Sequence, residues 1–103
     1  MERYYNDDEE LAVLISPGYG AGWSTWNDID IALDSKIIEY FMRSPKPTKK
    51  EMSHFLEENG YHNIYMGGYG GLTIEWIPKG TNFLIKEYDG SEYIETDKAM
   101  ITA

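Results

Sequence analysis

Glycine occupies every second position in the segment Gly18-Tyr19-Gly20-Ala21-Gly22, which follows Pro17 directly. This spacing opposes both helix and strand, because glycine loses more conformational freedom on folding than any other residue. The segment must therefore be a loop. An apolar run, Leu11-Ala12-Val13-Leu14-Ile15, precedes it and has the length and composition of a buried strand. The sequence thus predicts a glycine-rich loop that leaves a buried strand.

Two helices are expected in the middle of the chain. The first begins near Asp34 or Ser35, either of which can cap it, and ends before Pro45. The second is predicted by the sequence Thr48-Lys49-Lys50-Glu51, which fits a capping box. Gly60 lies where a C-terminal cap belongs, so this second helix is expected to end just before it.

The second half of the chain is predicted to be mostly β-structure. A strand at residues 63–66 leads through a glycine-rich turn into residues 72–77, in which apolar and polar side chains alternate. Residues 83–88 and 91–96 are expected to form a hairpin, because Asp89-Gly90 is a strong two-residue turn signal. The order of elements predicts an α+β fold, with an antiparallel or mixed sheet of about five strands and two helices on one face.

The length of 103 residues leaves room for one domain. We expect residues 1–10 to form a flexible acidic lead-in, residues 11–96 the α+β domain and residues 97–103 a loose tail. Nine tyrosines and three tryptophans favour interfaces as well as cores. A homo-oligomer, most simply a two-fold dimer, is therefore expected.

The charge balance is strongly acidic, with eighteen acidic residues, nine basic residues and a net charge of −9. Direct binding to nucleic acid or to an anionic membrane is disfavoured by this charge. No apolar run approaches the ~20 residues of a membrane span, and the first residues lack the pattern of a signal peptide. The expected location is the cytoplasm, and the absence of cysteine excludes disulfides and thiol nucleophiles.

The titratable residues form no pattern typical of an enzyme or a metal site. Asp28, Asp30 and Asp34 lack the further acidic residue and the glycine of an EF-hand calcium loop. His54 is expected inside a helix and His62 just before a strand, at a spacing that fits no zinc or hydrolase site. The sequence therefore predicts no metal, no cofactor, no catalytic residue and no enzymatic activity.

The glycine-rich loop is the main candidate for a binding site. Its backbone N–H groups can approach an anion closely, as in anion-binding nests. Ser24 and Thr25 would add hydroxyl donors, and Tyr19, Trp23 and Trp26 could stack on a base or a sugar. Glu75 would accept hydrogen bonds from ligand amines or hydroxyls if its face of the strand lines a pocket. The predicted ligand-binding residues are Ser16, Tyr19, Gly20, Gly22, Trp23, Ser24, Thr25 and Glu75. The competing interpretation is a tight loop whose aromatic residues merely pack onto the sheet.

Residues 15–27, with the sequence ISPGYGAGWSTWN, resemble a group of small uncharacterised proteins of tailed bacteriophages. Residues 74–81 and 87–92 are similar to the same group, so the resemblance covers roughly residues 11–95. It implies an accessory phage protein expressed in the cytoplasm of a bacterial host. By analogy with other small acidic phage proteins, such a protein would counter a host defence system by binding a host protein or a signalling nucleotide.

Two functional hypotheses follow from these features. In the first, a non-catalytic binding protein captures a small anionic or nucleotide-like ligand with the glycine-rich loop. In the second, an acidic protein–protein inhibitor mimics nucleic acid and occupies a basic groove of a host enzyme. The glycine–tryptophan loop supports the first hypothesis, and the acidic stretch that contains Glu87, Asp89, Glu92, Glu95 and Asp97 supports the second.

Overall fold

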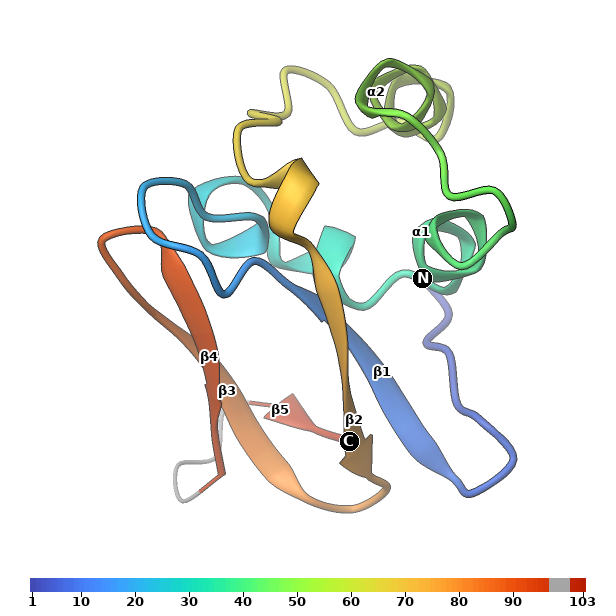
Figure 1. The fold of residues 1–103 in the computed structure, drawn as a ribbon. Coiled ribbons are helices and arrows are strands. Elements are labelled where there is room, and N and C mark those ends of the chain that lie inside the picture. Colours follow the sequence, from blue (N-terminus) through green and yellow to red (C-terminus); the bar gives the residue numbers. More distant parts are fainter. Residues whose placement is uncertain (97–100) are drawn as a thin grey trace.

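The computed structural model describes residues 1–96 and 101–103, with strand β1, Glu10–Ile15, at its centre (Figure 1). Alternate residues of β1 belong to two different hydrophobic clusters. Ala12 and Leu14 pack in one cluster, and Leu11 and Val13 pack in the other. Successive side chains of a strand point to opposite faces, so a continuous apolar run can fill two clusters at once. The buried strand predicted from this run is confirmed.

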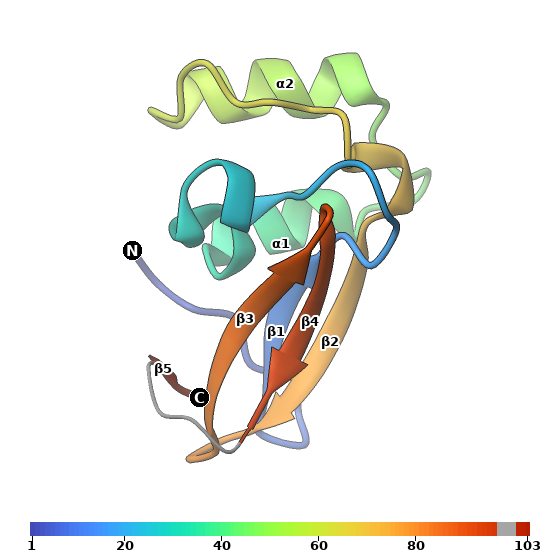
Figure 2. The same ribbon diagram turned by 90° about the vertical axis from the view of Figure 1, so that its left-hand side faces the viewer.

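The five strands form two antiparallel sheets (Figures 1 and 2). In the first, β1 pairs along its whole length with β2, Thr73–Pro78. In the second, β3, Asn82–Tyr88, lies between β4, Ser91–Glu95, and β5, Ile101–Thr102. The α+β class and the number of strands are confirmed, but one of the five is not a predicted strand, and the strands are divided between two sheets rather than joined in one. The second sheet supplies side chains that cover the second apolar face of β1.

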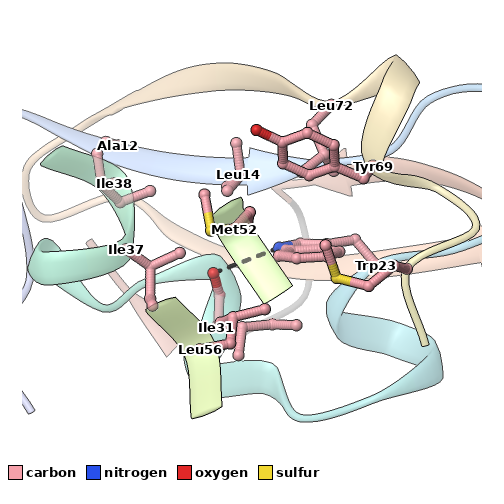
Figure 3. Packing of buried hydrophobic residues seen from close by; sticks show 11 residues of the cluster. Ala12, Leu14, Trp23, Ile31, Ile37, Ile38, Met52, Leu56, Tyr69 and Leu72 are labelled. Atoms are coloured by element: carbon pink, nitrogen blue, oxygen red, sulfur yellow. Dashed lines mark hydrogen bonds between the residues drawn. The ribbon is translucent and has the colours of Figure 1, made fainter. Parts of the chain in front are cut away.

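Helices α1, Ser35–Phe41, and α2, Lys49–Glu58, both contribute to the cluster that contains Ala12 and Leu14. Ile37 and Ile38 enter this cluster from α1, and Met52 and Leu56 enter it from α2 (Figure 3). Each helix buries one apolar face, as expected for an amphipathic helix that lies on a core. Two short 3₁₀ helices, Ser24–Trp26 and Ile29–Ala32, connect the glycine-rich loop to α1.

Residues 63–66 form no strand, in contrast to the sequence-based prediction. Asn63 has a positive φ of 59°, which interrupts an extended conformation. The backbone of Tyr65 is bound by the side chain of Asn27, which accepts from its N–H at 2.8 Å and donates to its C=O at 3.0 Å. A side-chain amide thus takes the place of a neighbouring strand.

Both ends of the described chain are held against the domain. The lead-in expected at residues 1–10 is tied down by Arg3, whose guanidinium donates a hydrogen bond to the C=O of Thr102 at 2.5 Å. At the other end, β5 pairs with β3 and Ala103 is buried, which differs from the loose tail that the sequence predicts. Residues 97–100 lie outside the described residues.

Helix α2 begins with the predicted capping box. The hydroxyl of Thr48 accepts a hydrogen bond from the N–H of Glu51 at 3.1 Å, and the Glu51 carboxylate accepts one from the N–H of Thr48 at 2.9 Å. The hydrogen bond from the Thr48 backbone, followed by that from the Arg43 side chain, lowers the pKa of the Glu51 carboxyl. Both bonds satisfy groups that the first turn of a helix leaves without partners.

We expect Thr48→Ala to lower the free energy of unfolding by about 1 kcal/mol, because it removes the acceptor for the N–H of Glu51. Ser53→Ala, in the middle of the same helix, is the matched control and should have little effect. Urea denaturation followed by circular dichroism measures both variants. Equal stabilities of the two would contradict the capping role of Thr48.

Candidate functional site

The donors of the glycine-rich loop converge on one carboxylate of the protein itself. Glu92, in β4, is only 1% exposed. Its Oε1 accepts a hydrogen bond from the N–H of Ser16 at 2.8 Å. Its Oε2 accepts from the N–H groups of Trp23 and Thr25, at 2.9 and 3.0 Å, and from the Thr25 hydroxyl at 2.5 Å. An arrangement of anion-binding donors therefore exists in the loop, and the side chain of Glu92 fills it.

Sequence reasoning missed Glu92 because it lies in an acidic stretch that looks exposed. The register of the hairpin indicates which face Glu92 occupies, but not its burial, because Glu87 on the same face is exposed. Glu92 and Ile94 alternate onto the same face of β4, opposite Glu87 and Ile85 of β3. Ile85 and Ile94 pack against the core, so the side chain of Glu92 points inward as well.

Trp23 is part of the core rather than of an open loop (Figure 3). Its ring is completely buried, and its Nε1 donates a hydrogen bond to the C=O of Ile31 at 3.4 Å. The neighbouring ring of Tyr69 lies 6.4 Å away between centroids. Ser24 is also buried, and its Oγ makes no hydrogen bond within the described part of the chain. Neither side chain is accessible to a ligand in this arrangement.

The other predicted site residues lie at the edge of this arrangement or away from it. Gly20 has a φ of 92°, and its N–H donates to the C=O of Asp89 at 2.6 Å, so the loop lies against the β3–β4 turn. Tyr19 is highly exposed next to this contact. The hydroxyl of Ser16 donates to the C=O of Ala21 at 3.0 Å. Glu75 is exposed on β2 opposite Val13 and is not brought together with the loop donors.

Two glycines provide surfaces on which exposed aromatic rings lie. A Cβ on Gly22 would come within 2.8 Å of the Trp26 ring, and a Cβ on Gly67 would collide with the Tyr65 ring. Glycine therefore permits a close approach of the rings to the backbone at both positions. The two rings lie 5.7 Å apart between centroids, at an interplanar angle of 34°. This close approach is a structural reason for one glycine in each glycine-rich segment.

The ring pair is also tied to the β3–β4 hairpin. The indole Nε1 of Trp26 donates a hydrogen bond to Oε2 of Glu87 at 3.2 Å. The same oxygen accepts from the N–H of Gly90 at 2.8 Å. Asp89 follows in the exposed turn after β3, and its C=O accepts the hydrogen bond from the glycine-rich loop. We call this surface the tip patch, and it consists of Tyr19, Trp26, Tyr65, Glu87 and Asp89.

Hollows on the protein surface lie away from the tip patch. One of about 690 Å³ runs along α2 and is lined by Lys49, Lys50, Ser53, His54, Glu57 and Met66. Another of about 520 Å³ is lined by Ile29, Leu84, Ile85 and Ile101. Within the first, Glu57 is paired with His62, and His54 lies 3.7 Å from Glu58. Ser53 and His54, both in the described part of the chain, line the first hollow, but no hydrogen bond joins them, as a hydrolase nucleophile and its base would require.

Among residues 1–96 and 101–103, no group of three or more His, Asp or Glu side chains is placed to hold a metal ion. No helix in the same ranges has the length and apolar character needed to cross a membrane. No protein-family model, curated protein or solved structure matches the chain.

Proposed function

We propose that this protein is a non-catalytic binding protein that recognises another protein through the tip patch. The observation that carries the proposal is the exposure of aromatic rings that are nevertheless held in place. Trp26 and Tyr65 are 43% and 51% exposed, yet each lies on a glycine and contacts the other ring. Tryptophan and tyrosine are enriched among the residues that dominate binding energy. Rings that are ordered before binding lose little further freedom on association.

The charge of the protein favours a basic partner. The net charge is −9, and the tip patch contains the carboxylates of Glu87 and Asp89. In the same stretch Glu92 is buried, and Glu95 lies 3.7 Å from Lys86. The proposal therefore follows the hypothesis of an acidic inhibitor in a basic groove, with aromatic rings supplying much of the contact. The resemblance to small phage proteins favours a protein of a bacterial host as the partner.

Capture of a small anion by the glycine-rich loop is the less favoured proposal. The three N–H groups and the hydroxyl that would hold an anion are already bonded to Glu92. A ligand at this place would have to displace a buried carboxylate, and the displaced carboxylate would need new partners. Such exchange gains little, because one set of charge-assisted hydrogen bonds replaces another.

The test compares two exposed aromatic residues, one inside the tip patch and one outside it. We expect Trp26→Ala to weaken binding of a captured host protein at least about tenfold, as truncation of a central aromatic residue does. Tyr93→Ala is the matched control, because Tyr93 is 45% exposed and lies on β4 outside the tip patch. Affinity capture from a bacterial lysate identifies the partner, and biolayer interferometry then measures its affinity for each variant.

The salt dependence of the measured affinity provides a second test of the proposal. Binding should weaken as the salt concentration rises from 50 to 500 mM, because salt screens attraction between exposed charges beyond roughly a few ångströms at high ionic strength. Equal losses of affinity in Trp26→Ala and Tyr93→Ala, or no captured protein, would contradict the proposal.

A further inference from the structure

We propose that Trp26, Tyr65 and Glu87 form a binding site for an arginine side chain of the partner protein. This inference rests on the proposed function and specifies the chemistry of its central contact. An arginine guanidinium is planar, so it can stack on an aromatic ring while its N–H groups bond a carboxylate at the edge. The tip patch contains both kinds of group, in direct contact with each other.

The carboxylate of Glu87 is held in position and retains capacity for a further donor. Its Oε2 accepts the hydrogen bonds from Trp26 Nε1 and from the N–H of Gly90, at 3.2 and 2.8 Å. Its Oε1 makes no hydrogen bond to the part of the chain that the structure describes. Because an ionised carboxylate has about four acceptor sites, an incoming guanidinium finds an oriented partner.

The aromatic rings of the site are held by their surroundings as well. The Trp26 ring lies on Gly22, and the Tyr65 ring lies on Gly67. Asn27, the residue after Trp26, holds Tyr65 next to it. Its side-chain amide accepts a hydrogen bond from the N–H of Tyr65 and donates one to the C=O of Tyr65. The site is therefore formed before a partner arrives, which reduces the entropy lost on binding.

Lysine and arginine side chains of the protein itself lie over aromatic rings elsewhere in the fold. Arg43 lies 4.5 Å from the centre of the Tyr40 ring, and Lys46 lies 4.6 Å from that of Phe41. Lys79 lies 5.5 Å from the ring of Tyr5. Among residues 1–96 and 101–103, no lysine or arginine lies over Trp26 or Tyr65. Within these described ranges, the exposed Trp26–Tyr65 ring pair beside Glu87 is available to a cation from another molecule.

The test uses small probes and the uniformly ¹⁵N-labelled full chain. N-acetyl-arginine amide is titrated against the protein, and N-acetyl-citrulline amide serves as the neutral analogue of the same shape. The indole N–H signal of Trp26 is followed by NMR and is assigned by its loss in Trp26→Phe. We expect a saturable shift with the arginine probe and none with the citrulline probe. N-acetyl-lysine amide should bind more weakly, because an ammonium group cannot stack on the ring pair.

Two carboxylate variants separate the site from the general charge of the protein. Glu87→Gln should weaken binding of the arginine probe about tenfold, because it removes the charged acceptor while keeping an oxygen for Trp26. Glu75→Gln, an exposed carboxylate on β2, removes the same charge and should leave the affinity unchanged. Equal effects of the two variants, or equal shifts with arginine and citrulline, would overturn the inference.

Failure of the arginine-site inference can be distinguished from failure of the proposed function. If Trp26→Ala abolishes partner capture while the arginine probe does not bind, the tip patch is an interface and the arginine site is wrong. If the arginine probe binds and weakens in Glu87→Gln while no partner is captured, the site is supported and the proposed function is contradicted.

Discussion

Replacing Trp23 by alanine should lower the free energy of unfolding by about 3–5 kcal/mol, the range found for large aromatic residues removed from protein cores. The ring is completely buried in the hydrophobic cluster to which β1 and both helices contribute (Figure 3). Its removal leaves a cavity and also leaves the C=O of Ile31 without its donor. Because domains of this size are stable by only about 5–15 kcal/mol, much of the stability should be lost.

Trp26→Ala is the matched control, since Trp26 lies three residues further along the same loop but is exposed. We expect this variant to lose no more than about 1 kcal/mol. Guanidinium denaturation followed by far-ultraviolet circular dichroism compares the two without depending on tryptophan fluorescence. A Trp23→Ala protein as stable as Trp26→Ala would show that the ring is not required for the core.

Glu92→Ala should destabilise the protein by about 3 kcal/mol, because several donors lose their common acceptor at once. These donors are the N–H groups of Ser16, Trp23 and Thr25, together with the Thr25 hydroxyl. Part of this loss of stability should be confined to the segment around Trp23 and Thr25. We therefore expect amide hydrogen exchange at Trp23 and Thr25 to accelerate about a hundredfold, the factor that corresponds to roughly 3 kcal/mol.

Two comparisons test whether the carboxylate itself is responsible. Glu75→Gln, at an exposed carboxylate of β2, should leave stability and exchange unchanged. Added formate should raise the melting temperature of Glu92→Ala but not that of the native protein, because a small carboxylate can bind to the vacated donors. Unchanged exchange in Glu92→Ala would mean that the loop is held by other contacts.

The amino-acid sequence by itself determined those features that depend on neighbouring residues. The apolar run at residues 11–15 produced a buried strand, and Thr48 with Glu51 produced a capping box. Asp89 and Gly90 both have positive φ, at 49° and 83°, as expected for the central residues of a tight hairpin turn. Each of these patterns acts over a few residues, so no knowledge of the fold is needed to find it.

Only the tertiary structure decided what the glycine-rich loop and the acidic stretch do. Glu92 binds the N–H of Trp23 across 69 residues and that of Ser16 across 76, whereas the sequence presents loop and acidic residues as separate features. Their pairing requires β4 to lie next to the end of β1, which depends on how the two sheets pack. The predicted homo-oligomer likewise depends on surfaces rather than on local pattern, and it stays a prediction. A single sequence specifies local geometry directly, but partners that are distant along the chain are defined only once burial has brought them together.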